Sequence, residues 1–525
     1  MGDEVDAVVI GSGPNGLVAA NLLADAGWDV LVLEAADVPG GAVRTAELVA
    51  PGFRADLFSA FYPLGAASPV IAGLGLERHG LVWRRAPEVL AHVLPDDRCV
   101  LLSTDPDRTA ASVEAFGVGD GQAWHAEVAL WQRARAALLE SLLRPFPPVR
   151  AGARLVGALG TAEALRLVRS FTQSVRAYGA DRFSGVGAPL LLAGNAMHTD
   201  LGPEQAGGAA FGWLLSMLGQ DVGYPVPEGG AGALTDALVR RLGRRVECGR
   251  EVTGVVVAGG RALGVRDASG GLVRARRAVL ADVPAPTLYL RLVGADHLPA
   301  RLVHDLARFA WDDATIKVDW ALSRPIPWLA PQARLAGTVH LGGDLDGLSA
   351  SANELERGLV PTTPFLIMGQ MTTADPSRSP AGTESVWAYT HVPRGGRWPA
   401  DRLRRHADVI EDLVERHAPG FRDAVLGRVV QGPGDLEDAN PSLVGGSINQ
   451  GTAAVHQQLV FRPVPGLGRA DTPVDRLFLA GSSAHPGGGV HGAAGANAAR
   501  AALARAGLAG DAYRLLVDLA HRAVY

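Results

Sequence analysis

The stretch that most constrains the fold is the N-terminal segment 6–34, DAVVIGSGPNGLVAANLLADAGWDVLVLE. An apolar strand at Ala7–Ile10 runs into the glycine turn 11–16. An alanine-rich helix at Leu17–Ala26 follows, and then a second apolar strand at Val30–Leu33. This order of strand, glycine turn, helix and strand is typical of an α/β unit that binds the pyrophosphate of a dinucleotide.

Each glycine of the turn has its own physical role. Gly11 makes the tight turn, Gly13 lets backbone N–H groups approach a pyrophosphate, and Gly16 lets the helix pack close to the strand. Pro14 and Asn15 lie at the start of the helix, where the partial positive charge of the helix dipole favours phosphate groups. We expect all five residues to bind the cofactor.

Glu34 ends the second strand and can accept hydrogen bonds from a ribose diol. Its carboxylate would repel a 2′-phosphate, so the sequence predicts FAD or NAD and not NADP. The competing interpretation is a glycine turn in an unrelated α/β protein.

Length, net charge and cysteine content predict the number of domains and argue against several classes of function. A chain of 525 residues exceeds the usual size of a single core, which predicts two domains. The net charge of −5 gives no reason to expect a nucleic-acid partner. Cys99 and Cys248 form no C-x-x-C pair, which argues against a disulfide framework, a metal site and a redox-active dithiol.

Targeting and membrane signals are weak in this sequence. The first predicted strand begins close to Met1, which leaves little room for a signal peptide. The most apolar long stretch, 155–175, is interrupted by charged residues, so we expect no integral membrane segment. These observations predict a cytoplasmic protein.

Predicted elements follow a recognisable order along the chain. Residues 105–190 have mostly helical periodicity, with a proline-rich break at 144–148. An amphipathic helix at 234–242 precedes a β-rich part, whose strands are predicted at 251–257, 262–266, 272–274 and 278–281. The last unit is a strand at 476–480, a glycine-rich segment and a helix at 493–506. The nucleotide-binding half is therefore predicted to combine the start, the middle and the end of the chain.

The glycine-rich segment 481–492, GSSAHPGGGVHG, has the same arrangement as the first turn, with a strand before the glycines and a helix after them. In a flavoenzyme, its N–H groups and the following helix can stabilise negative charge on the reduced isoalloxazine. His485 and His491 are candidates to line that ring; the alternative is that both are loop residues bonded to backbone groups. Two histidines with no nearby carboxylate make a poor metal site, so we expect no metal.

Lys317 is the only lysine of the chain. All the other residues with a long, positively charged side chain are arginines. Unlike arginine, lysine is a compact point charge that can lose its proton when it is buried. The sequence therefore suggests a special role for Lys317, against the alternative that one lysine was left by chance.

Several motifs, taken in order, resemble one family. They are G-x-G-x-x-G with Glu34, the P-G-G-x-x-R-T turn at 39–45, the P-x-G-G-x-x-x-L loop at 227–234 and L-F-L-A-G-x-x-x-H-P-G-G-G-V-H-G at 477–492. Together they resemble the FAD-dependent amine oxidase and phytoene desaturase superfamily, most closely its phytoene-dehydrogenase-like branch. Supporting stretches at 315–328, 337–342, 375–393 and 440–446 extend the resemblance over nearly the whole chain.

The resemblance implies FAD as the cofactor and assigns further residues to its binding. Gly41 and Arg44 would lie along the phosphates and the flavin edge, and Val252 would contact adenine through its backbone. The residues that would border the isoalloxazine are Gly481, Gly488, Gly489 and Val490. The resemblance also places Lys317 on a strand that carries a lysine near flavin N5; the alternative is an ion pair with Asp319 or Asp313.

The resulting prediction is a two-domain α/β (α+β) flavoprotein. A Rossmann-like FAD-binding domain would comprise discontinuous segments, 1–70, 220–290 and 470–525. A substrate domain with a mixed sheet and helices would comprise 71–219 and 291–469. The aromatic residues expected to line its pocket are Phe58, Tyr62, Trp213, Trp387 and Tyr389, although such residues often belong to a plain core.

The predicted activity is that of an oxidoreductase. It takes hydride from a C–H bond of a largely apolar small molecule onto flavin N5. Oxidation of a C–N bond and of a C–C bond are both open, and so is assembly into a homo-oligomer. The alternative is a flavin-containing protein that acts mainly as a non-catalytic interaction module.

Overall fold

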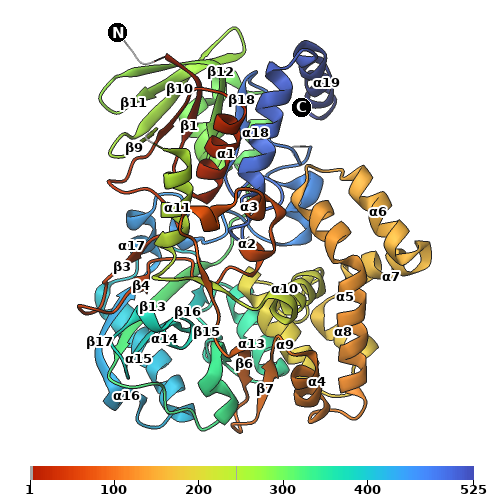
Figure 1. The fold of residues 1–525 in the computed structure, drawn as a ribbon, viewed down its shortest axis with the longest axis vertical. Coiled ribbons are helices and arrows are strands. Elements are labelled where there is room, and N and C mark those ends of the chain that lie inside the picture. The colour runs from red at the N-terminus through yellow and green to blue at the C-terminus, as the bar shows by residue number, and fades with distance from the viewer. Residues whose placement is uncertain (1–3, 244, 467) are drawn as a thin grey trace.

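Two β-sheets organise the chain, one in the upper half and one in the lower half of Figure 1. The computed structural model describes residues 4–243, 245–466 and 468–525. Within these ranges each sheet has seven strands. The mixture of sheets and helices confirms the predicted fold class.

The first sheet joins distant parts of the sequence. Its order is β10-β11-β12-β1-β2-β9, and β18 lies beside β12. β1 pairs in parallel with β2 and β12, and β12 pairs in parallel with β18. The strand bounds are β1 (Glu4–Ile10), β2 (Val30–Leu33), β9 (Val246–Glu247), β10 (Val252–Ala258), β11 (Arg261–Asp267), β12 (Leu272–Ala281) and β18 (Leu477–Leu479).

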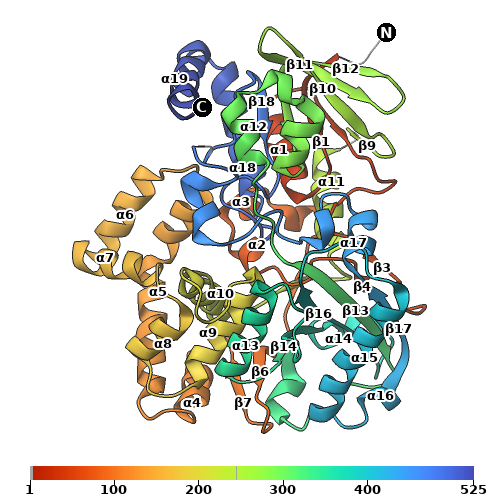
Figure 2. The same ribbon diagram turned by 180° about the vertical axis from the view of Figure 1, so that it is seen from behind.

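Two alanine-rich helices from opposite ends of the chain cover one face of this sheet. α1 (Pro14–Asp25) and α18 (Ala493–Ala506) lie side by side (Figures 1 and 2). Ala20 and Ala498 belong to one fully buried cluster with strand residues such as Val9. Small side chains let these helices approach the sheet and each other closely, which brings both glycine segments to the same edge of the sheet.

The other face of the sheet is covered by the helical turn η3 (Thr287–Val293) and by α12 (Ala300–Leu306). Leu302 and Leu306 share a buried cluster with strand residues of the first sheet. The predicted division of the chain assigns α12 to the substrate domain. The division stays a prediction, and this packing favours drawing its boundary after α12.

The second sheet is mixed, in the order β17-β13-β16-β15-β14-β6-β7. Its neighbouring strands are antiparallel except for β14 and β6, which are parallel. The bounds are β6 (Glu88–Val93), β7 (Cys99–Leu102), β13 (Ala314–Leu322), β14 (Ala336–Leu341), β15 (Leu366–Gln370), β16 (Glu384–Val392) and β17 (Val425–Gln431). One face packs apolar residues such as Trp320 and Val386 against α15 (Ala400–His417). Several residues of the other face line a cavity, described below.

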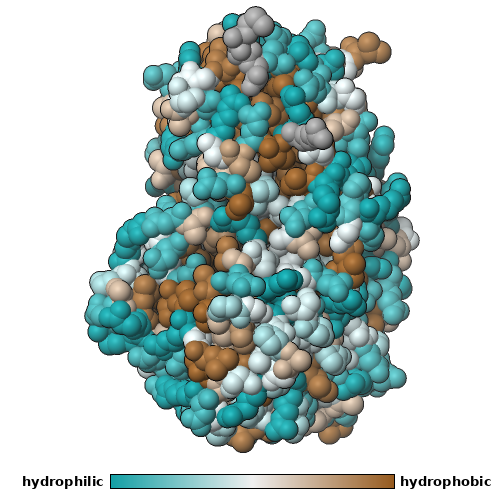
Figure 3. All heavy atoms as spheres, turned by 60° about the vertical axis from the view of Figure 1, so that its left-hand side comes forward, coloured by the Kyte–Doolittle hydropathy of each residue, from teal (hydrophilic) through white to brown (hydrophobic). Residues whose placement is uncertain are grey.

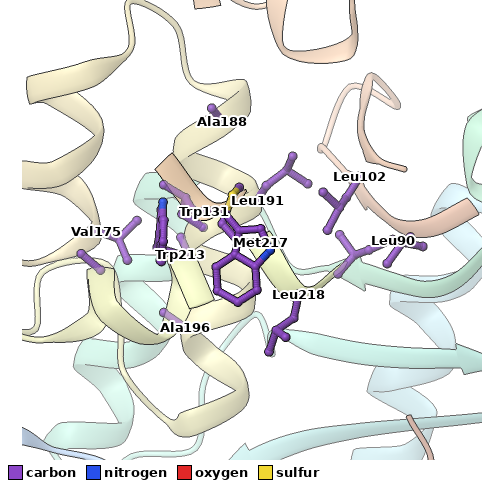
Figure 4. Packing of buried hydrophobic residues seen from close by; sticks show 14 of the residues in the cluster. Leu90, Leu102, Trp131, Val175, Ala188, Leu191, Ala196, Trp213, Met217 and Leu218 are labelled. Carbon is purple, nitrogen blue, oxygen red and sulfur yellow. The ribbon is translucent and has the colours of Figure 1, made fainter. Parts of the chain in front are cut away.

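A block of helices stands beside the second sheet, at the lower right of Figure 1. Its members are α4 (Pro106–Glu114), α5 (Asp120–Leu143), α6 (Val149–Leu159), α7 (Thr161–Ser170), α8 (Val175–Arg182), α9 (Gly187–Ala196) and α10 (Gly208–Val222). The break between α5 and α6 falls at the predicted proline-rich segment. The core between this block and the sheet contains Trp131, Trp213 and Met217 (Figure 4).

In the ranges described, no helix has both the length and the apolar composition needed to cross a membrane. The face drawn in Figure 3 is mostly hydrophilic, with apolar residues in small separate groups.

Candidate active site

A cavity of about 710 Å³ is lined by residues of both sheets and of both glycine segments. From the N-terminal motif it is lined by Gly11, Gly13, Pro14, Asn15 and Glu34. The other predicted residues that line it are Gly41, Arg44, Phe58, Val252, Lys317, Trp387, Tyr389, Gly488, Gly489, Val490 and His491. One continuous space thus joins the two ends of the chain to the second sheet.

The N-terminal turn has no room for side chains at its three motif glycines. Gly11 has a φ of +88°, and a Cβ there would lie 2.8 Å from the carbonyl oxygen of Asp282. A Cβ on Gly13 would lie 2.5 Å from the Asp282 carboxylate, and one on Gly16 would lie 2.2 Å from the carbonyl oxygen of Gly11. Gly16 itself does not line the cavity; its role is the close approach of α1 to β1.

Asp282 is a site residue that our sequence analysis missed. It directly follows β12, lines the cavity, and accepts a hydrogen bond from the Gly16 backbone N–H at 2.7 Å. Burial raises the pKa of its carboxyl to about 7, and the nearby Glu34 charge adds to this rise. The signal for it was an acidic residue at the carboxyl end of a parallel strand, next to the switch in strand order.

Glu34 is held in place by the turn that it faces. Oε2 accepts hydrogen bonds from the backbone N–H of Ser12 at 2.8 Å and from the Ser12 hydroxyl at 2.6 Å. Oε1 accepts a hydrogen bond from the Ala36 N–H at 2.9 Å. The two bonds from Ser12 use both lone pairs of Oε2, whereas Oε1 accepts one bond and has a second lone pair for a ribose hydroxyl.

The segment after β2 folds back onto the glycine turn. A Cβ on Gly41 would lie 3.1 Å from the Cα of Gly13. Arg44 donates to the carbonyl oxygens of Gly41 at 3.0 Å and Ala439 at 2.7 Å, and its guanidinium lies 5.1 Å from the centre of the Phe58 ring. These contacts position Arg44 at the cavity wall, where Val252 at the start of β10 is also found.

The C-terminal glycine segment is packed against three other parts of the chain. A Cβ on Gly481 would lie 2.6 Å from the carbonyl oxygen of Val283, so Gly481 supports the cavity without lining it. A Cβ on Gly488 would lie 2.9 Å from the Asn449 side chain, and one on Gly489 2.8 Å from Leu64. Close packing at these positions explains why glycine is needed there.

The two histidines of this segment differ in position. His491 lines the cavity, and its Nδ1 accepts a hydrogen bond from the Ala493 N–H at 3.0 Å, at the start of α18. His485 does not line the cavity; its Nε2 lies 3.0 Å from the carbonyl oxygen of Arg144. Burial lowers the pKa of both imidazoles to about 4. We therefore no longer assign His485 a catalytic role, because its ring is bonded to backbone away from the cavity.

Lys317 forms the ion pair with Asp319 that the sequence offered as one interpretation, and its place near flavin N5 stays a prediction. It lies on β13, lines the cavity and is only 4% exposed. Its Nζ lies 2.5 Å from both carboxylate oxygens of Asp319, two residues along the same strand. Burial raises the pKa of the Asp319 carboxyl, while the neighbouring ammonium opposes that rise. The ion pair holds the only lysine of the chain in the cavity wall.

Two of the predicted pocket aromatics are elsewhere. Tyr62 is fully buried outside the cavity lining, and its hydroxyl donates to the Ser59 carbonyl oxygen at 2.9 Å. Trp213 is part of the core in Figure 4, with its indole N–H 2.8 Å from the Glu127 carboxylate. Both are corrected to core residues. The spacing of aromatics in a sequence does not distinguish a pocket wall from a helix interface.

The chain's own residues fit FAD. The first turn of α1 has no acidic residue and no side-chain cap. Pro14 has no N–H and the N–H of Gly16 is bonded to Asp282, so the Asn15 N–H is the one left in this turn for a phosphate oxygen. Near Gly488, Asn449 Nδ2 and Gln450 Oε1 line the same cavity and have no hydrogen-bond partner among the described residues. Such buried polar atoms are expected to bond to a polar group of the bound cofactor.

Comparisons with known proteins agree with this geometry. The model of the family described as flavin containing amine oxidoreductase matches residues 15–503. The chain is 31% identical to pyridine nucleotide-disulfide oxidoreductase domain-containing protein 2 of Rattus norvegicus, over 94% of this chain and 93% of the relative. It is 26% identical to the lycopene-forming phytoene desaturase of Pseudescherichia vulneris, over 94% and 98% of the two chains.

A solved structure shares the fold. Cyclohexylamine oxidase from Brevibacterium oxydans IH-35A superposes with a TM-score of 0.57 at 18% identity, over 95% of this chain and 98% of that one. The family match covers most of the chain, including the whole of the second glycine segment. The chain therefore belongs to the family of flavin containing amine oxidoreductases and is an FAD-dependent oxidoreductase.

Proposed function

We propose that this oxidoreductase dehydrogenates a largely apolar small molecule, which is bound in the cavity between the glycine segments and the second sheet. The observation that carries the proposal is the continuity of that cavity, which is lined by Gly11 and Gly13 at one end and by Trp387 and Tyr389 at the other. A bound FAD supplies a two-electron acceptor that takes hydride at N5. The alternative of a non-catalytic interaction module is not favoured.

The cofactor-binding roles are assigned to the N-terminal unit. The backbone N–H groups of Gly13 and Asn15 bind the pyrophosphate at the start of α1, because the helix dipole is positive there. Glu34 accepts hydrogen bonds from the adenosine ribose, and Val252 lies against the adenine. Gly41 and Arg44 flank the phosphates on the side of the folded-back segment.

The ring end is assigned to the C-terminal segment and to β13. Gly488, Gly489 and Val490 border the ring, with His491 beside them as a neutral imidazole at the start of α18. Lys317 holds a proton at the cavity wall, and Asp319 fixes the position of its ammonium. Two charges in a wall that excludes water interact more strongly than they would in solvent.

The substrate end is assigned to an apolar wall. Phe61, Leu214, Leu215, Ile367 and Trp387 line the cavity near the second sheet and the helical block. Apolar walls favour a substrate with a large hydrocarbon part. Oxidation of a C–N bond and of a C–C bond both remain compatible with this wall.

The test is an anaerobic screen of the purified holoenzyme. A small molecule that is a substrate bleaches the absorbance of oxidised flavin in the absence of oxygen, and admitting an electron acceptor restores it. If chemical reductants reduce the flavin but no apolar amine, alcohol or unsaturated compound does so, the proposed substrate class is wrong.

Location and assembly are further parts of the proposal. Both cysteines are free thiols, which supports a reducing compartment such as the cytoplasm. Self-association is a prediction for analytical ultracentrifugation, where a mass above that of one 54.6 kDa chain would support it.

A further inference from the structure

A row of cross-strand neighbours crosses the second sheet, and all but one of its side chains are polar. The cross-strand pairs are Lys317 with Tyr389, Tyr389 with Ile367, and Ile367 with His340. His92 continues the row on β6. Polar groups in a cavity wall favour a ligand that can form hydrogen bonds with them.

His198, just after α9, lies against this row. Its Nε2 is 2.9 Å from Nε2 of His340, and the two rings are 5.1 Å apart. His198 lines the cavity and is partly accessible, and its Nδ1 has no hydrogen-bond partner in the described ranges. Nδ1 is not fully enclosed by the protein, and because His198 lines the cavity, this nitrogen is the one that can face it.

The surroundings of His340 decide which nitrogen carries its proton. A Cβ placed on Gly194 would lie 2.3 Å from Nδ1 of His340 and 3.3 Å from Nδ1 of His92. Nδ1 of His340 therefore faces an α-carbon, which offers no acceptor, and it is buried without a partner. Buried N–H groups without an acceptor are rare in proteins, so the proton belongs on Nε2.

This tautomer fixes that of His198. If His340 donates from Nε2, Nε2 of His198 is the acceptor, and the proton of a neutral His198 lies on Nδ1. Burial lowers the pKa of His198 to about 3, which keeps the imidazole neutral near pH 7. His198 therefore presents an N–H donor to the cavity.

Two other side chains of the cavity wall, which are cross-strand partners of each other, also offer donors. Tyr389 is partly accessible and lines the cavity, and its hydroxyl has no hydrogen-bond partner in the described part of the chain. The Lys317 ammonium has three N–H groups, and the two oxygens of Asp319 accept two of them. We call His198, Tyr389 and Lys317 the donor pole.

We propose that the donor pole binds a carbonyl oxygen of the substrate, so that the natural substrate is a carbonyl compound with an otherwise apolar skeleton. This inference rests on the proposed function and names the substrate's polar group. A pure hydrocarbon would leave the donors unpaired, and an ammonium group would point N–H at N–H.

A carboxylate fits the donor pole less well than a neutral carbonyl. The Lys317–Asp319 pair has no net charge, and neither has the pair of His391 and Asp200, whose nearest atoms are 3.0 Å apart. No excess positive charge is therefore at hand to offset the cost of burying an anion. A metal is not indicated either, because the described residues contain no cluster of three or more His, Cys, Asp or Glu arranged to hold one.

The test uses three probes of nearly the same shape: acetophenone, α-methylstyrene and protonated 1-phenylethylamine. Calorimetric titration of the anaerobic holoenzyme measures the affinity for each. We expect acetophenone to bind about tenfold more tightly than α-methylstyrene, since a net hydrogen bond of about 1.4 kcal/mol corresponds to tenfold. The ammonium should bind more weakly than the ketone.

Single substitutions show which side chains cause the preference for the ketone. His198→Phe should reduce the tenfold preference for the ketone and leave the affinity for α-methylstyrene unchanged. His198→Asn should keep most of the preference, because its amide N–H lies near the position of Nδ1. Tyr389→Phe is a second variant that should reduce the preference, and His521→Phe on α19 (Gly510–Val524) is the control that should not.

Failure of the donor pole can be distinguished from failure of the proposed function. Equal affinity for ketone and alkene, or a preference that His198→Phe and Tyr389→Phe leave intact, overturns the donor pole even when the flavin is reducible. Absence of flavin reduction by any small molecule counts against the proposed function alone, since calorimetry does not depend on turnover.

Discussion

Burial determines how much a charged residue of this protein contributes to stability, and the Lys317–Asp319 pair is the clearest case. Both side chains are almost completely enclosed, at 5% and 1% exposure. Removal of one partner leaves an uncompensated charge in a site that water does not reach. Replacement of both removes the charges together.

We therefore expect Lys317→Met and Asp319→Leu to lower the free energy of unfolding by about 3–5 kcal/mol each. The double variant Lys317→Met/Asp319→Leu should lose clearly less than the sum, and urea denaturation of the three proteins measures this coupling. Strict additivity would show that the ion pair contributes nothing.

Asp282 gives a pH dependence whose sign follows from its surroundings. Burial raises the pKa of this carboxyl from 3.8 to about 7, so the protonated form is favoured in the folded protein. Raising the pH through 7 ionises Asp282 beside the N–H groups that bind the pyrophosphate, and the two negative charges repel. FAD affinity should therefore fall from pH 6 to pH 8. Because a single proton is lost, the affinity can fall by at most about tenfold per pH unit.

Asp282→Asn keeps an acceptor for the Gly16 N–H without the charge. We expect its FAD affinity, measured by fluorescence titration of the apoprotein, to be nearly flat over the same pH range. A variant as pH-dependent as the unmodified protein would remove Asp282 from the explanation.

At the scale of elements, the position of α1 depends on Gly16. A Cβ there would lie 2.2 Å from a backbone oxygen that cannot move aside easily. Gly16→Ala should thus push α1 away from β1, weaken FAD binding by more than tenfold and lower the thermal midpoint. Gly157→Ala in α6 is the matched control, because its Cβ would meet nothing within 4 Å. That helical substitution should stabilise the protein by up to about 1 kcal/mol.

Elements with a strong local signal were predicted well. The first glycine turn, β2 and α18 have the bounds that the sequence predicts, because glycine position and apolar period are local properties. β12 was predicted as two short strands, since Arg276 and Arg277 interrupt its apolar pattern. Both arginines lie within 3.3 Å of the Asp6 carboxylate on β1, which lets the strand continue through them.

The parts of the site that were missed depend on pairings between distant segments. β14 lies beside β6, about 250 residues earlier in the chain, and no local pattern predicts that neighbour. His198, His340 and Asp282 become site residues only through such pairings. Trp213 was misplaced for the same reason, since its partner Glu127 comes from another helix.

At the scale of the whole molecule, the cavity connects residues from Ile10 to His491. The two glycine segments, 11–16 and 481–492, are joined by few hydrogen bonds. One of these is the bond from Asn15 Nδ2 to the Ser482 hydroxyl, at 3.3 Å. A ligand that contacts both segments therefore adds contacts that the protein alone does not have.

Removal of FAD should accordingly loosen the two ends of the chain together. We expect hydrogen exchange in the apoprotein to speed up in 11–16 and in 481–492, while α5 in the helical block stays protected as before. Adding FAD at a hundred times its Kd should restore about 2.7 kcal/mol of stability. Faster exchange in only one of the two glycine segments would mean that the cofactor does not bridge them. Unchanged exchange in both would mean that the site is fully organised before FAD binds.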